Sequence, residues 1–128
     1  MTRRKKEIVV EIPATPPSAN RIWRGGNGRT FLSREAVAFY NLARAALAGR
    51  RAPANWKFYD VEIVIVPTRR SGDVDNRIKP TLDALTTAGF WDDDKRVARV
   101  SACFALPTRD GGTIVTIRPA VSKYPFIS

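Results

Sequence analysis

Residues 58 to 85 read FYDVEIVIVPTRRSGDVDNRIKPTLDAL, and this stretch predicts a strand, a polar connection and a helix in that order. The strand is expected from Trp56 to Val66, because apolar side chains occupy alternate positions over that length and Pro67 follows. The alternating side chains are Tyr59, Val61, Ile63 and Ile65. A helix is expected from roughly Asn76 to Ala88. The connection between the two elements holds the aspartates Asp73 and Asp75.

The predicted helix carries a core stripe of Ile78, Leu82 and Leu85, and Gly89 terminates it. Pro80 fits such a helix only near its first turn, where the missing backbone N–H costs little. The proline therefore leaves the start of this helix open by several residues.

The remaining elements follow from similar patterns. Alternation predicts a strand over Glu7 to Ile12. Ser33 predicts the N-cap of a helix that runs to about Ala48, with a repeated apolar stripe of Ala36, Tyr40, Ala43 and Leu47. Residues 100 to 118 predict two strands joined by a turn with Asp110, Gly111 and Gly112, paired as an antiparallel hairpin. Residues 15 to 30 are rich in Arg, Gly and Pro, which predicts an exposed and mobile basic loop.

These elements predict one α+β domain over residues 1–128. It is expected to contain a small mixed sheet of about four strands with two main helices packed on it. The ends, residues 1–6 and about 119–128, are expected to be irregular.

Charge is distributed unevenly along the chain. The 128 residues carry a formal net charge of +10, which favours an anionic partner, with nucleic acid ahead of a membrane surface. A basic protein that is merely soluble is the alternative. Residues 1–57 hold twelve Lys and Arg but three acids, whereas half of the twelve acids lie between Asp73 and Asp94. Clustered carboxylates would repel DNA unless a cation bridges them.

Several classes of chemistry are excluded by composition. The chain has no histidine and one cysteine, Cys103, so it has no Ser-His-Asp or Cys-His catalytic arrangement, no intramolecular disulfide and no thiolate-rich zinc site. No apolar stretch is long enough to suggest a membrane span or a signal peptide. The cytoplasm is therefore the expected location.

The acidic residues suit metal-ion chemistry. In extended backbone, Asp73 and Asp75 would point to one side and could hold one ion together. A third carboxylate would come from the run Asp92 to Asp94. Mg²⁺ held by carboxylates is the commonest means of phosphodiester hydrolysis without histidine or cysteine. Lys79 would stabilise charge on the phosphate, and Asp83, four residues later, would orient it.

Each of these residues also has a structural reading. Asp75 could cap the following helix, Lys79 and Asp83 could form an ordinary i,i+4 ion pair, and the Asp92–Asp94 run could be a solvated turn. An EF-hand is excluded, because Ile78 stands where the calcium loop needs glycine and Ala84 where it needs glutamate.

The segment DVDNRIKPTLDALTTAGFWDDDKRV, residues 73 to 97, resembles the signature of the RusA family of Holliday junction resolvases. The matching features are Asp-x-Asp-Asn, a lysine, Asp-Ala-Leu, Gly-Phe-Trp and a final acidic cluster. PPSANRIW and GRTFLS, earlier in the chain, are similar to that family's first loop and helix entry. The likeness extends from about Ile8 to Ile117.

This resemblance implies a Mg²⁺-dependent endodeoxyribonuclease, for which Mn²⁺ would be a substitute ion. It implies a homodimer of bacterial, bacteriophage or prophage origin that nicks two opposed strands of a four-way DNA junction. The family's essential aspartates, which are the expected metal ligands, fall on Asp73, Asp75 and Asp94, and its lysine falls on Lys79. The residues expected to support this site are Asn76, Asp83 and Asp93.

Basic side chains outside the acidic cluster are expected to hold DNA phosphates. They are Arg21, Arg24, Arg29, Arg69, Arg70 and Arg77. Trp23 or Phe31 is expected to stack on bases exposed at the branch point. Two other functions stay open: a non-catalytic protein that binds branched DNA, and a nuclease that acts on flaps, forks or single strands.

Overall fold

The computed structural model of the chain describes residues 6–26, 29–70 and 72–124. The strands are β1 (Ile8–Ile12), β2 (Trp23–Gly26), β3 (Arg29–Leu32), β4 (Phe58–Val66), β5 (Val97–Phe104) and β6 (Gly112–Ala120). The helices are α1 (Arg34–Ala46) and α2 (Ile78–Thr87), and three short 3-10 turns are η1 (Ala19–Arg21), η2 (Asp75–Arg77) and η3 (Asp94–Arg96).

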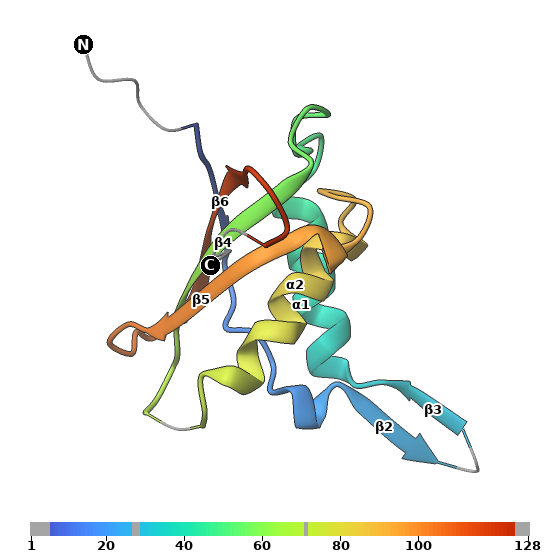
Figure 1. Cartoon of the computed structure of the whole chain (residues 1–128). Coiled ribbons are helices and arrows are strands. Elements are labelled where there is room, and N and C mark those ends of the chain that lie inside the picture. The colour runs from blue at the N-terminus through green and yellow to red at the C-terminus, as the bar shows by residue number, and fades with distance from the viewer. Residues whose placement is uncertain (1–5, 27–28, 71, 125–128) are drawn as a thin grey trace.

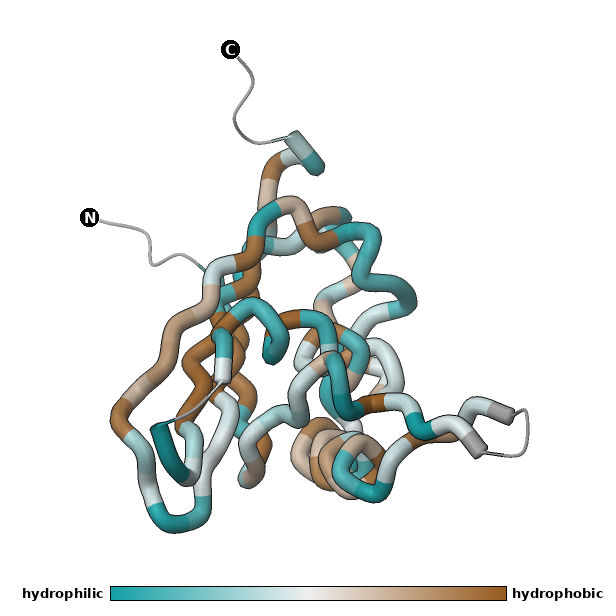
Figure 2. The backbone as a smooth tube through the Cα atoms, turned by 90° about the horizontal axis from the view of Figure 1, so that it is seen from below, coloured by the Kyte–Doolittle hydropathy of each residue, from teal (hydrophilic) through white to brown (hydrophobic). Residues whose placement is uncertain are grey.

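Four strands form a mixed sheet in the order β1-β6-β4-β5, and both helices pack on it (Figure 1). The α+β architecture predicted from the sequence is therefore confirmed. The side chains of β4 that were expected to share a face are buried, with Tyr59, Val61, Ile63 and Ile65 at most 2% exposed. Apolar segments occur along both the strands and the helices of the backbone (Figure 2).

The predicted pairing of the last two strands is wrong. β5 and β6 do not pair with each other, because β4 lies between them. β5 runs parallel to β4 after the α2 crossover, and β6 returns antiparallel on the other side of β4. Their connection crosses the end of β4, where Ala105 N donates to Ile65 O at 2.8 Å and Thr108 N donates to Pro67 O at 2.9 Å. Two strands joined by a short turn run in opposite directions, but the sequence pattern does not decide whether they are neighbours in the sheet.

The first helix forms as its sequence predicts. The Ser33 hydroxyl accepts a hydrogen bond from Ala36 N at 3.2 Å, which makes Ser33 the N-cap of α1. The expected stripe, from Ala36 to Leu47, is buried.

The second helix begins slightly later than expected. α2 starts at Ile78 and η2 precedes it. Pro80 is the third residue of α2, so its missing N–H lies in the first turn and costs no intrahelical hydrogen bond. Gly89 ends the helix with φ of +80°, a conformation that favours glycine.

Residues 15 to 30 do not form a plain loop, although their composition predicts an exposed and mobile basic loop. They include η1 and most of the β2–β3 hairpin, which projects from the body of the domain (Figure 1). Trp23 is 60% exposed and Phe31 is 53% exposed, whereas Trp56 and Trp91 are buried. The hairpin therefore presents two aromatic side chains to solvent.

The ends differ modestly from expectation. β6 continues to Ala120, past residue 119, where the irregular tail was expected to begin. Residues 1–5 and 125–128, which belong to the predicted irregular ends, lie outside the described part. No helix among the described residues is long and apolar enough to cross a membrane.

Candidate functional site

Lys79 links two acidic residues at the start of α2. Its Nζ donates to Asp94 Oδ2 at 2.6 Å and lies 3.0 Å from Asp83 Oδ1. The pKa of Lys79 is raised, first by the hydrogen bond to Asp94 and then, against desolvation, by Asp83. Lys79 therefore keeps its positive charge at neutral pH. The predicted pairing of Lys79 with Asp83 is present, and Asp94 is a second partner fifteen residues away in sequence.

Asp94 is positioned by the buried connection that precedes it. Phe90 is fully buried, and Trp91 stacks on Tyr59 with ring centroids 5.0 Å apart. Trp91 Nε1 also donates to Thr86 Oγ1 at 2.8 Å. These contacts fix the chain on α2 and β4 immediately before the acidic run.

The three aspartates of that run have different partners. Asp92 pairs with Arg51 at 3.1 Å on the surface. Asp93 accepts a hydrogen bond from Lys95 N at 2.9 Å, which makes it the N-cap of η3 and lowers its pKa. Asp93 therefore supports the turn that presents Asp94 to Lys79. An aspartate whose side chain accepts from the amide two residues later is a common turn pattern, so the sequence could have predicted this role of Asp93.

The other two expected ligands lie on the connection before α2. Asp73 and Asp75 are exposed, and neither carboxylate has a hydrogen-bond or ion-pair partner among the described residues. The prediction of an extended backbone here is wrong, because Val74 is right-handed helical (φ −65°, ψ −36°) and Asp75 begins η2. The argument that an extended backbone puts both carboxylates on one side therefore does not apply here. Asp75 does not cap a helix either, since neither η2 nor α2 has a side-chain cap.

The expected metal triad is not assembled among the residues that the structure describes. No three Asp, Glu or Cys side chains there lie close enough to hold one ion, and Asp94 is paired with Lys79 instead. The donor chemistry nevertheless fits Mg²⁺, which prefers carboxylate oxygens. The carboxylates of Asp73 and Asp75 have no partner among the described residues, so binding an ion would break no such contact.

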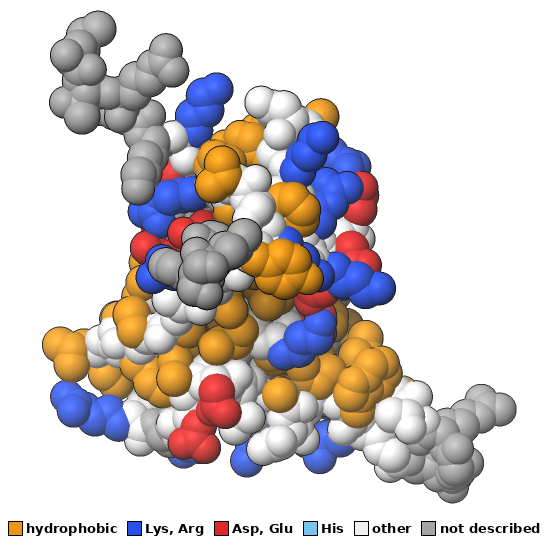
Figure 3. All heavy atoms as spheres, in the orientation of Figure 1, with side chains coloured by type: hydrophobic (Ala, Val, Ile, Leu, Met, Phe, Trp, Pro, Cys, Tyr) orange, Lys and Arg blue, Asp and Glu red, His pale blue; other side chains and the backbone are white. Residues whose placement is uncertain are grey.

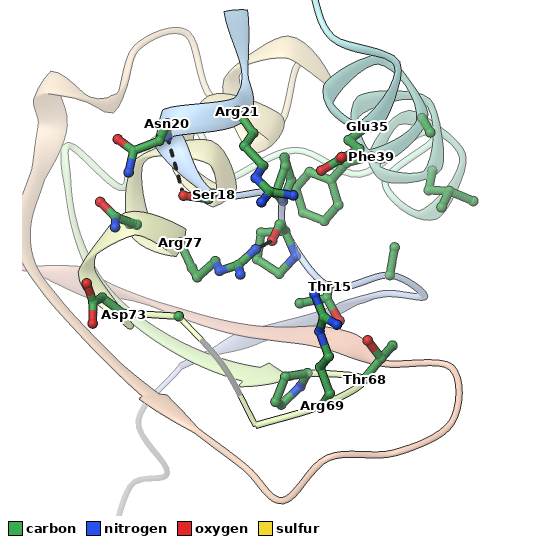
Figure 4. A pocket seen from close by; sticks show the side chains of 18 residues that line it. Thr15, Ser18, Asn20, Arg21, Glu35, Phe39, Thr68, Arg69, Asp73 and Arg77 are labelled. Carbon is green, nitrogen blue, oxygen red and sulfur yellow. Dashed lines mark hydrogen bonds between the residues drawn. The ribbon is translucent and has the colours of Figure 1, made fainter.

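A cavity of about 710 Å³ has Asp73 in its lining (Figure 4). Arg21, Arg69 and Arg77 extend into it from three segments of the chain, and Asp73 lies at its edge. The remaining polar side chains of the lining are Thr15, Ser18, Asn20, Glu35, Thr68 and Asn76. The structure therefore brings together three of the six predicted DNA-binding arginines, along with Asn76.

The other three arginines are elsewhere. Arg70 lines a separate, mainly apolar cavity with Phe104 and Leu106. Arg24 is exposed on β2, and the side chain of Arg29 lies outside the described part. Figure 3 shows Lys and Arg side chains at several places on one face, with apolar areas between them. Glu35, which composition did not single out, is the carboxylate that the structure adds to the arginine-lined cavity.

Two carboxylates without a partner among the described residues, a charged lysine paired with a third, and an arginine-lined cavity that includes Asp73 define a domain equipped to act on phosphodiesters. The model of the family described as Endodeoxyribonuclease RusA matches residues 13–118, and the chain belongs to this family.

Curated relatives agree with the family match. A crossover junction endodeoxyribonuclease of Enterobacteria phage 82 is 36% identical over 102 residues, which cover 77% of this chain and 83% of the relative. Proteins of the same description from Shigella sonnei strain Ss046 and Escherichia coli strain K12 are each 35% identical with the same coverage. The chain is thus related to nucleases that act on DNA.

Proposed function

We propose that this protein is a Mg²⁺-dependent endodeoxyribonuclease that resolves Holliday junctions by paired nicks during DNA recombination and repair. The observation that carries the proposal is the Lys79–Asp94 pair at the start of α2, on the chain segment that follows the unpartnered Asp73 and Asp75. Family membership and the names of the relatives support the junction as the substrate.

Asp73, Asp75 and Asp94 would hold the ion, and Mn²⁺ would be able to replace Mg²⁺. When bound, the ion supplies a hydroxide nucleophile near neutral pH and neutralises charge on the phosphate. Asp73 and Asp75 provide oxygen ligands that make no other described contact. Asp94 is held ready by Lys79, so its negative charge is compensated while the site is free.

Lys79 has a second role toward the substrate. Because Lys79 contacts Asp94, its ammonium can donate to the oxygen of a phosphate that is bound beside these carboxylates. Its positive charge would favour the transition state, in which negative charge accumulates on the phosphate. Asp83, the other partner of Lys79, would keep the ammonium near this position if Asp94 held the ion. Asp93 and Asn76 support the site, through the cap of η3 and at the edge of the cavity.

A homodimer fits this activity, because a four-way junction is approximately two-fold symmetric and resolution needs two matched cuts. Each subunit would supply one set of carboxylates. The relatives come from a phage and from enterobacteria, which supports a bacterial or phage origin and action in the cytoplasm, where the DNA is.

The test is incubation of the purified protein with a labelled synthetic four-way junction and with a matched linear duplex, in Mg²⁺ or in EDTA. Paired nicks are expected on the junction alone and only with Mg²⁺. Asp75→Asn is expected to abolish cleavage and to retain binding, whereas Asp110→Asn, an exposed change on the β5–β6 connection, leaves both unchanged.

Two results would contradict the proposal. Tight junction binding without any cleavage in Mg²⁺ or Mn²⁺ would make this a non-catalytic binding protein. Faster cleavage of flaps, forks or single strands than of the junction would keep the nuclease and change its substrate.

A further inference from the structure

The arginine-lined cavity is built from parts of the chain that are distant in sequence. Arg21 comes from η1, Arg69 from the connection after β4, and Arg77 from the end of η2 (Figure 4). Among these three, Arg77 is part-buried and the other two are exposed. Three guanidinium groups facing one hollow repel one another, and Glu35 and Asp73 are the acidic side chains in its lining. The cavity therefore carries an excess of positive charge.

Arg77 is held in place from two sides. Its Nη1 donates to Pro16 O at 2.5 Å, and its Nη2 passes so close to Gly72 that an added Cβ there would lie 3.1 Å away. Gly72 has φ of +83°, so the absence of a side chain serves both the turn and the arginine. A guanidinium fixed in this way loses little freedom when it binds a ligand.

The wall that holds Arg77 is itself tied to the sheet. Thr15 Oγ1 donates to Val66 O at 2.7 Å, and Thr113 Oγ1 donates to Ala14 O at 2.7 Å. The segment that supplies the Pro16 carbonyl is therefore fastened to β4 and β6. The part of the cavity that holds Arg77 is therefore preformed.

The charge of the lining indicates that the cavity suits an anion. The guanidinium groups of Arg21, Arg69 and Arg77 line it together and repel one another. An anion between the guanidinium groups would relieve that repulsion. Phosphate oxygens match the planar fork of arginine, and the hydroxyl and amide groups of the lining can add hydrogen bonds.

The place of the cavity identifies the source of that anion. Asp73 borders the cavity and also belongs to the proposed metal site, so the two sites share an edge. A group bound in the cavity would lie next to the phosphate that is cut. The volume of about 710 Å³ exceeds what one phosphate needs and accommodates an attached sugar.

We propose that this cavity binds the phosphodiester and sugar adjoining the cleaved linkage on the same DNA strand. Arg77 is the fixed anchor of the phosphate, and Arg21 and Arg69 close around it. This inference rests on the proposed function, since it takes the bound strand to be the one that is cut.

The experiment neutralises one phosphate at a time. Four-way junctions are prepared, each with a single uncharged methylphosphonate within three nucleotides of the cut on either side, and their affinities are measured by fluorescence anisotropy in EDTA. For the wild-type protein, one linkage next to the cut is expected to lower affinity about 10-fold when it is neutralised.

The variants show whether the cavity reads that linkage. Arg77→Ala, Arg21→Ala and Arg69→Ala are expected to bind the normal junction about 10-fold more weakly and to become insensitive to that one methylphosphonate. Arg77→Lys keeps the positive charge but loses the planar guanidinium, so its affinity for the junction is expected to lie between those of the wild type and Arg77→Ala. Arg44→Ala, on the exposed side of α1, removes an equal charge away from the cavity and is expected to keep the full penalty.

Glu35 provides a test in the opposite direction. Its carboxylate lines the same cavity and would repel a bound phosphate, so Glu35→Gln is expected to tighten junction binding several-fold. This gain does not depend on the folding of Arg77→Ala, because Glu35 is exposed on the first turn of α1.

The proposal is overturned if every methylphosphonate has the same effect on the arginine variants as on the wild type, or if Glu35→Gln leaves affinity unchanged. Because these are binding measurements in EDTA, they are independent of whether the protein cuts. If the protein makes paired nicks but the arginine variants stay sensitive to every methylphosphonate, the cavity proposal fails and the resolvase proposal stands. If the variants lose sensitivity to one linkage but the protein makes no nicks, the cavity proposal stands and the resolvase proposal fails.

Discussion

At the scale of single residues, Lys79 is the most informative side chain of the site. It contacts one carboxylate on its own helix and another on η3. The contact with Asp83 is the ordinary i,i+4 pair of a helix surface, but the contact with Asp94 serves no helix. Surface ion pairs contribute little to stability, and this contact is the one on which the proposed role of Lys79 in cleavage rests.

Replacing Lys79 by alanine is expected to lower the single-turnover cleavage rate by about 10²–10³-fold, because a charge that favours the transition state is lost. Junction affinity measured by anisotropy in EDTA should change less than 3-fold. Asp83→Asn, which leaves the Lys79–Asp94 contact in place, should lower the rate by less than 10-fold. An affinity loss for Lys79→Ala as large as its rate loss would make the lysine a phosphate anchor instead.

Asp93 shows how a neighbour of the site acts through the backbone. Asp93→Ala removes the cap of η3 and is expected to reduce cleavage several-fold without changing the ligand set, whereas Asp93→Asn retains an acceptor oxygen and should retain most activity. Single-turnover rates of the two variants decide this. Equal losses in both would mean that the negative charge, and not the cap, is what the site needs.

At the scale of elements, the α2–β5 connection joins stability to function. Phe90 and Trp91 belong to the segment that resembles the family signature, and both are buried beside α2 and β4. Their burial holds the chain that carries Asp94. The aromatic part of the signature is therefore structural, and the acidic part next to it is exposed or partly exposed.

Phe90→Ala is expected to lower the free energy of unfolding by about 3–5 kcal/mol, because it leaves a cavity in the core. Trp91→Phe, which loses the 2.8 Å hydrogen bond to Thr86, should cost about 1 kcal/mol. Urea denaturation followed by circular dichroism measures both. Tyr124→Ala, at an exposed position, serves as the control. If Phe90→Ala lowered the free energy of unfolding as little as Tyr124→Ala does, the core would not hold this connection in place.

The β2–β3 hairpin offers a different element-scale test. Trp23 and Phe31 are exposed aromatic residues whose removal costs the core little. If they stack on bases at the branch point, Trp23→Ala or Phe31→Ala should weaken junction binding by about 5- to 150-fold. The melting temperature should stay within a few degrees of the wild type. Unchanged affinity in both variants would remove the hairpin from the DNA interface.

At the scale of the whole molecule, the proposed dimer predicts that each of the two cuts can be removed without the other, by inactivating one subunit. A mixed dimer of one wild-type and one Asp75→Asn subunit, purified with two different tags, is expected to nick one strand and leave the junction unresolved, because each subunit cuts its own strand. Electrophoresis under native and denaturing conditions distinguishes nicked from resolved DNA. Full resolution by the mixed dimer would show that one site makes both cuts.

The sequence by itself determined the local structure and the chemical character of this protein. Alternation predicted β1 and β4, Ser33 predicted the start of α1, and Gly89 predicted the end of α2, because these features depend on neighbours within a few residues. The acidic motif and the absence of histidine indicated metal-dependent chemistry, since both depend only on residue type and order.

Only the tertiary structure decided which distant residues meet. It placed β4 between β5 and β6, set Asp94 against Lys79, and gathered Arg21, Arg69 and Arg77 around one cavity. It also showed that the backbone between Asp73 and Asp75 is not extended, because Val74 is right-handed helical and η2 begins at Asp75. The reason is physical: residue patterns govern backbone conformation locally, whereas strand order and the closing of long loops are set by how whole elements bury their apolar faces together.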